Sequence, residues 1–278
     1  MANKPIVALL YDFDKTLCTT DMQNYSFIPA LGMSPDEFWS ATETFSHKHG
    51  VERILSYMYM MVEMCKERGI ACTREYLVSQ GKNIKFFEGV SNWFKRINEF
   101  GNELGLIVEH YLVSSGTKEI IEGCAIAKEF KAIYGCEFHY DEETNLPIWP
   151  KTAINYTAKT QYFFRISKGV LDQSDDQAVN IKTLKRRIPY RNIIYFGDGL
   201  TDVPIMILVK ENGGNSIAVY HDSNKEHVSN LFEDGRVNYI ARADYRSGSD
   251  IDKVIKLILT EIAVQSELAK KQEQLLKK

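Results

Sequence analysis

An apolar run close to the start of the chain, residues 6–11, ends at two aspartates, Asp12 and Asp14. A continuous apolar run of this length predicts a strand that is buried on both faces of a parallel sheet. Alternate residues of a strand share a face, so both carboxylates would point the same way at its carboxyl end. Because open α/β sheets bind ligands along that edge, the pair is a candidate functional site.

Further apolar runs recur along the chain, with helical patterns between them. They predict strands at residues 106–113, 192–196, 216–220 and 237–240. Strands that alternate with helices are typical of the α/β class, and we expect a doubly wound, Rossmann-like parallel sheet. A long C-terminal helix is predicted to begin at Ser249, and its last residues, 269–278, are expected to be frayed and solvated.

Residues 20–105 interrupt this alternation with four helical patterns and no clear strand. Ser34 is a typical N-cap and is followed by proline at the first helical position. We therefore expect an inserted α-helical cap domain at residues 20–105, on a core domain formed by residues 1–19 and 106–278. Residues 137–156 contain turn residues between alternating segments and predict a β-hairpin.

Two carboxylates as close as Asp12 and Asp14 repel each other unless a cation or a proton compensates them. The pair therefore suits a bound magnesium ion, with one carboxylate as a nucleophile toward phosphorus and the other as a proton shuttle. The alternative is an ordinary turn, because Asp-Lys-Thr after a strand is common turn chemistry.

At these residues the sequence resembles the haloacid dehalogenase (HAD) superfamily of phosphatases. Residues 12–16 match the D-x-D-x-T motif of the family, and three later motifs follow in the family's order. They are a serine after an apolar strand, a lysine, and a G-D-x-x-x-D sequence, matched by Ser114-Ser115-Gly116, Lys159 and residues 197–202. The large helical insert between the first two motifs is similar to the cap of the phosphoserine-phosphatase-like branch.

The resemblance implies a role for each matched residue. Asp12 would be the nucleophile and a magnesium ligand, and Asp14 would be the general acid/base and a magnesium ligand through its backbone carbonyl. The other implied roles are phosphate binding by Ser114, Ser115, Gly116 and Lys159, and metal binding by Asp198 and Asp202.

Alternatives remain open for several of these residues. Ser114 could instead cap a helix that starts near Gly116, and Asp198 and Asp202 could be turn residues. Lys151 and Lys168 compete with Lys159 as the lysine of the third motif.

The resemblance implies magnesium-dependent hydrolysis of a small phosphate monoester through an aspartyl-phosphate. A cap over the site would restrict access and favour a small phosphorylated metabolite. A phosphotransferase or phosphomutase that uses the same aspartyl-phosphate stays open as an alternative, as does a non-catalytic binding protein on the same fold.

Composition narrows the remaining possibilities. A net charge of −3 argues against a nucleic-acid-binding surface, which needs clustered lysine and arginine. No apolar run approaches the ~20 residues that span a bilayer, so no membrane partner is expected. The five cysteines are scattered without a Cys-x-x-Cys pair, which predicts reduced thiols in a cytoplasmic protein. The oligomeric state is not predicted.

Overall fold

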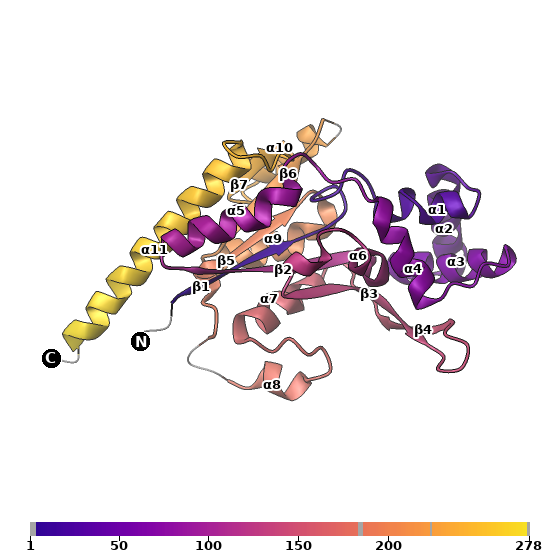
Figure 1. Ribbon diagram of the computed structural model, residues 1–278, viewed down its shortest axis with the longest axis horizontal. Coiled ribbons are helices and arrows are strands. Elements are labelled where there is room, and N and C mark those ends of the chain that lie inside the picture. Colours follow the sequence, from indigo (N-terminus) through magenta and orange to yellow (C-terminus); the bar gives the residue numbers. More distant parts are fainter. Residues whose placement is uncertain (1–3, 183–185, 223, 277–278) are drawn as a thin grey trace.

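A seven-stranded sheet forms the centre of the protein, as Figure 1 shows for the computed structural model. The structure describes residues 4–182, 186–222 and 224–276. The strands lie in the order β4-β3-β2-β1-β5-β6-β7, and every neighbouring pair is parallel except β3 and β4. Their bounds are β1 Ile6–Tyr11, β2 Ile107–Thr117, β3 Ala132–Tyr140, β4 Pro147–Thr152, β5 Ile193–Gly197, β6 Asn215–Tyr220 and β7 Tyr239–Arg242.

The predicted α/β class and doubly wound sheet are confirmed, with β4 as an antiparallel strand at one edge. β1 lies between β2 and β5, so the strand order reverses at β1 and creates the topological switch point where such sheets bind ligands. The predicted hairpin corresponds to β3 and β4, but sequence analysis missed that β3 also pairs in parallel with β2. The polar and half-buried positions of β3 do not form a continuous apolar run.

Helices cover both faces of the sheet. In β5, Phe196 packs against Trp93 of α5, whereas the adjacent Tyr195 points the other way and donates to Asp202, just before α9. The helices of the core are α5 Val90–Glu103, α6 Lys118–Glu122, α7 Lys159–Lys168, α8 Asp176–Asn180, α9 Val203–Glu211, α10 Lys225–Glu233 and α11 Asp250–Leu276. Short 3-10 helices are η1 Met22–Asn24, η2 Gln80–Asn83, η3 Ala127–Glu129, η4 Tyr190–Asn192 and η5 Leu200–Asp202.

The first helices of the insert gather beyond the β3 and β4 edge of the sheet (Figure 1). They are α1 Phe27–Ala30, α2 Pro35–His49, α3 Arg53–Glu67 and α4 Arg74–Ser79. The predicted start of α2 is confirmed, since Ser34 and Glu37 form a capping box there. Met58, Met61 and Met64 are buried on one side of α3, where they fill the interior of this helical group.

The last helix of the insert, α5, packs on the core instead. It contacts β2 and α11, and Arg96 forms an ion pair with Asp252 of α11 at 3.0 Å. The two connections to the remaining helices run side by side, because Thr19 N donates to the carbonyl of Lys85 at 3.0 Å. The cap boundary at residues 20–105 stays a prediction.

The C-terminal helix differs from expectation at its far end. Its start is as predicted, because the amide of Asp252 donates to Ser249 Oγ at 3.3 Å. The residues from 271 to 276 are exposed, as expected for the solvated end of the chain, and α11 continues as a helix to Leu276. Over the described residues, no helix combines the length and apolar character that crossing a membrane requires.

A buried chain of hydrogen bonds fastens α5 to β1 and β2. Trp93 Nε1 donates to the hydroxyl of Tyr11 at 2.9 Å, and this hydroxyl in turn lies 3.0 Å from Nδ1 of His110. His110 Nε2 lies 3.0 Å from the side-chain oxygen of Asn98. A neutral imidazole satisfies both contacts of His110 if Nδ1 accepts from Tyr11 and Nε2 donates to Asn98. The Tyr11 hydroxyl then accepts from Trp93 and donates to His110. Burial lowers the pKa of His110 to about 3, which keeps the ring in this neutral form.

His110 should therefore make stability depend on pH. Its folded-state pKa lies below the unfolded value, so its contribution is complete above pH ~6.5 and is lost as pH falls toward ~3. For His110→Gln, whose amide keeps one donor and one acceptor but does not titrate, we expect a loss of about 1–3 kcal/mol at pH 7.5. This difference from wild type should shrink by about 2 kcal/mol at pH 5 in urea unfolding, because only wild type must exclude a proton there. A difference that is constant between the two pH values would contradict the neutral buried imidazole.

Candidate active site

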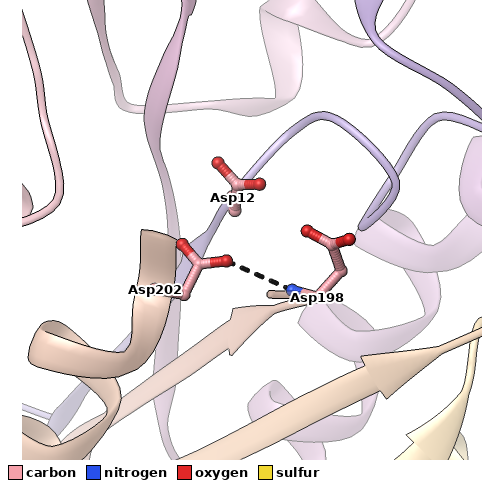
Figure 2. A group of neighbouring side chains, drawn as sticks. All are labelled: Asp12, Asp198 and Asp202. Carbon is pink, nitrogen blue, oxygen red and sulfur yellow. Dashed lines mark hydrogen bonds between the residues drawn. The ribbon is translucent and has the colours of Figure 1, made fainter. Parts of the chain in front are cut away.

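Three aspartates converge at the carboxyl ends of β1 and β5 (Figure 2). Asp12 follows β1, and its amide donates to the carbonyl of Phe196 at 2.8 Å, which fixes it at the switch point. Asp198 follows β5, and Asp202 ends the η5 turn. Each carboxylate offers an oxygen within 4.8 Å of the others. The predicted juxtaposition of these residues is thus what the parallel topology produces.

Lys159 lies at the start of α7 and is fully buried beside these carboxylates. Its Nζ atom lies 2.8 Å from Asp12 Oδ1 and 2.6 Å from Asp202 Oδ1. The competing lysines lie elsewhere: Lys151 pairs with Glu137 at 2.8 Å, and Lys168 donates to the carbonyl of Ile181 at 2.8 Å. Of the three candidates, Lys159 is the one that the fold brings to Asp12.

Asp202 is held by four donors. Lys159 and the hydroxyl of Tyr195, at 2.6 Å, donate to Oδ1, while the amides of Asp198 and Gly199 donate to Oδ2 at 3.2 and 3.4 Å. The close approach requires glycine at 197, because a Cβ there would lie 2.5 Å from Asp202 Cγ. Both oxygens are engaged, so this geometry suits a residue that positions Lys159 and the loop of Asp198.

Asp14 lies apart from this cluster but lines the same cavity. Its Oδ1 accepts from the amide of Met22 at 2.7 Å, which ties the motif to the beginning of the insert. The turn depends on Lys15, whose φ of 57° is left-handed and whose ammonium lies 2.8 Å from Asp21. The carboxylate of Asp14 therefore faces the cavity from the side of the cap.

The serine motif lies in an irregular part of β2. The register between β2 and β3 shifts between Val113 and Thr117, and such irregularities re-aim side chains. Ser114 Oγ accepts from the amide of Gly116 at 2.9 Å. The structure contradicts the helix-cap alternative for Ser114, because α6 begins only at Lys118.

Gly116 is close to both Asp14 and η1. A Cβ at Gly116 would lie 2.0 Å from Met22 Cε and 3.2 Å from Asp14 Oδ2, so a side chain there would have to displace the end of the buried Met22. Ser115 also lines the cavity, and its carbonyl accepts from Tyr57 of α3 at 2.7 Å. Tyr57 thereby joins the helical insert to the serine motif.

The electrostatics of the site reflect crowded and buried carboxylates. Burial, with a smaller contribution from the neighbouring Asp202, raises the pKa of Asp12 to about 6 against the attraction of Lys159. The pKa values of Asp14 and Asp198 are raised well above their ordinary range, first by burial and then by the nearby acids. Burial alone would lower the pKa of Lys159, but the attraction of Asp12 and Asp202 outweighs it and raises that pKa.

These charges fit a divalent cation. Three clustered carboxylates face the single ammonium of Lys159, which leaves two negative charges uncompensated when all are ionised. Hard carboxylate oxygens are the ligands that magnesium prefers. Asp12 and Asp198 are the better candidates for direct ligands, because Asp202 already accepts four hydrogen bonds.

The site opens into a cavity of about 730 Å³ between the sheet edge and the helical insert. The core side carries the residues described above, together with Tyr156 and residues 199–201. The opposite wall is formed mainly by α2 and the start of α3, with Asp36, Trp39, Ser40, Thr42, Glu43, Ser46, Arg53, Ile54 and Tyr57. Cap and core thus enclose one shared space.

Sequence analysis missed Tyr195 and the residues of this opposite wall. The tyrosine lies in a buried strand, where an aromatic residue gives no sign of a polar partner. Asp36, Glu43 and Arg53 look like ordinary polar positions of surface helices, and only the packing of the insert turns them toward Asp12. No local signal in the sequence identifies them.

Comparison with known proteins gives a consistent result for the fold. No model of a known protein family matches the sequence. An uncharacterized protein of Borreliella burgdorferi (strain ATCC 35210 / DSM 4680 / CIP 102532 / B31) is 28% identical over 272 residues, which cover 88% of this chain and 94% of that one.

The fold is similar to those of solved phosphatases and hydrolases. A HAD family hydrolase from Salmonella enterica subsp. enterica serovar Typhi matches with a TM-score of 0.59 at 14% identity, over 90% of this chain and 70% of that one. The phospho-aspartyl intermediate analogue of phosphoserine phosphatase matches with a TM-score of 0.56 at 16% identity, over 91% of this chain and 99% of that one. The substrate-bound complex of phosphoserine phosphatase matches with a TM-score of 0.57 at 15% identity, over 91% of this chain and 99% of that one. The chain therefore has the HAD fold, in the form seen in phosphoserine phosphatases, and the resemblance noted in the sequence is confirmed for the fold.

Removal of the buried ammonium should be costly. For Lys159→Met we expect a loss of about 3–5 kcal/mol in the free energy of unfolding at neutral pH, since Asp12 and Asp202 would lose their buried counter-ion. The loss should diminish at acidic pH, where the carboxylates protonate. Lys151→Met, which removes an exposed ion pair, should change stability by less than about 1 kcal/mol in the same urea titration. Equal effects of the two substitutions would contradict the bridging role of Lys159.

Proposed function

We propose that the protein is a magnesium-dependent phosphatase that hydrolyses a small phosphate monoester through an aspartyl-phosphate on Asp12. The observation that carries the proposal is the position of the Asp12 carboxylate. It lies at the switch point of the sheet, lines the cavity, and contacts the buried ammonium of Lys159 at 2.8 Å. The similarity in fold to phosphoserine phosphatase supports the same chemistry.

The residues divide the reaction between them. An oxygen of Asp12 attacks the phosphorus and displaces the alcohol oxygen of the ester, which takes a proton from the carboxyl of Asp14. The raised pKa of Asp14 favours the protonated form that this step needs. Asp14 then accepts a proton from water as the water attacks the aspartyl-phosphate, which releases inorganic phosphate and restores Asp12.

Lys159 and the serine motif would hold the phosphate during both steps. The ammonium of Lys159 can neutralise a phosphate oxygen, and the hydroxyl groups of Ser114 and Ser115 line the same cavity. Magnesium, held by Asp12, Asp198 and the backbone carbonyl of Asp14, would neutralise the charge of the transferring group. Asp202 would position Lys159 and Asp198.

The proposed substrate is a small phosphorylated metabolite with further polar groups. The wall opposite Asp12 carries two acids, Asp36 and Glu43, a base, Arg53, and an aromatic residue, Trp39. A wall of mixed charge suits a compact polar molecule, and the helical insert lies opposite Asp12 across the cavity. A cytoplasmic location, where such metabolites occur, is part of the proposal.

A nearly isosteric change tests the nucleophile. Asp12→Asn should reduce phosphate release to the background of the assay, because the amide cannot attack phosphorus, while the fold stays intact. Activity is measured as phosphate release across a panel of small phosphate esters with magnesium. Asp222→Asn, at an exposed ion pair with Arg242, is the matched control and should keep full activity. Substantial turnover by Asp12→Asn would overturn the assignment, and transfer to an acceptor without release would favour a phosphotransferase.

The metal site can be tested without a substrate. Magnesium should raise the melting temperature of the wild-type protein in proportion to the logarithm of its concentration, because it binds the folded state. Asp198→Asn should need at least about tenfold more magnesium for the same rise in melting temperature, since a carboxylate ligand is lost. Asp222→Asn again serves as control. A chelated protein with full phosphatase activity would rule out the metal requirement.

A further inference from the structure

The C-terminal helix has two apolar faces. One carries Ile251, Ile255, Ile258, Leu259 and Ile262 and is buried against the core. The other carries an outer stripe, defined as Leu257, Val264, Leu268 and Leu275, whose members are 71%, 56%, 65% and 71% exposed. At 100° per residue, the outer stripe lies on the side of α11 opposite the buried face.

The second half of α11 does not pack against the core. Ile262 is the last buried residue of α11, yet the helix continues to Leu276. Figure 1 shows this part leaving the body of the protein toward the C-terminus. A short helical segment without tertiary packing is only marginally stable in water, so packing along the outer stripe would stabilise it.

We propose that α11 pairs with α11 of a second copy of this chain as an antiparallel two-helix coiled coil. The outer stripe is symmetric about Ser266: Leu257 and Leu275 lie nine residues on either side of it, and Val264 and Leu268 lie two. A two-fold axis at Ser266 therefore places Leu257 against Leu275 of the partner subunit and Val264 against Leu268 of the partner subunit. Spacings of seven, four and seven residues are those of a heptad seam.

Two charges on the same side of α11 specify the antiparallel direction. Glu261 and Lys271 each lie five residues from Ser266 and, at 100° per residue, flank the outer stripe. The antiparallel pairing brings Glu261 against Lys271 of the partner subunit, twice in each dimer. A parallel pairing in register would instead oppose Glu261 to Glu261 and Lys271 to Lys271, which repel each other.

The pairing leaves the two cores apart. The outer stripe faces away from the core on each copy, so the two cores lie on the outer sides of the helix pair. The overlap from Leu257 to Leu275 is about 27 Å long. The active sites, at the other end of each sheet, stay accessible.

The oligomeric state of the full chain tests the apolar seam. Light scattering coupled to size exclusion should give twice the chain mass of 31.9 kDa, and Leu268→Glu should reduce it to the mass of one chain. Leu276→Glu is the matched control, because Leu276 is 81% exposed but lies off the outer stripe, and this variant should remain dimeric. Unchanged thermal unfolding of the core would show that Leu268→Glu is folded.

A charge exchange tests the direction of the helices. Glu261→Lys and Lys271→Glu should each raise the dissociation constant of the dimer by at least about tenfold, and the double variant should restore it. A parallel dimer would show no such rescue. Three results would overturn the proposal. They are a monomeric wild type, a dimer whose mass Leu268→Glu does not change, and a monomer that sediments with anionic phospholipid vesicles through the outer stripe.

Discussion

The buried ammonium of Lys159, placed between the carboxylates of Asp12 and Asp202, is the interaction on which the site depends. It joins three separate parts of the chain: the end of β1, the start of α7 and the η5 turn after β5. Burial of ionised groups is costly unless each is paired and hydrogen-bonded. Here Tyr195 and two backbone amides satisfy the remaining oxygen positions of Asp202, so the lysine is held in one place.

In this arrangement the residues proposed to act in catalysis are also those whose buried charges depend on one another for stability. Asp12 keeps one oxygen on Lys159, and burial raises its pKa despite the attraction of that ammonium. A divalent cation would balance the two negative charges that remain when the three clustered carboxylates are ionised. The helical insert then contributes closure and a polar wall, while the core holds every residue proposed to act on phosphorus.

Much of this could be predicted from the sequence, because buried parallel strands leave continuous apolar runs and the acids follow them directly. Asp12 and Asp14 were found in this way, whereas Asp198 was implied by the resemblance to the HAD motifs. β3 was missed because its apolar positions are interrupted, and α5 was assigned to the cap although its aromatic face packs on the core. Asp36, Glu43, Arg53 and Tyr195 reach the site only through tertiary packing, which no local pattern encodes. The end of the C-terminal helix was expected to fray, whereas among the described residues α11 continues to Leu276.

The central claim is that phosphorus becomes covalently attached to Asp12 during turnover. It is tested most directly by rapid acid quench of the wild-type protein with magnesium and a substrate ester, followed by borohydride reduction and peptide mass spectrometry. An acyl phosphate on Asp12 is reduced to homoserine, so the account predicts this mass change at position 12 and its absence without substrate. Phosphate release with an unmodified Asp12, or with the phosphoryl group on Ser114, would contradict the account.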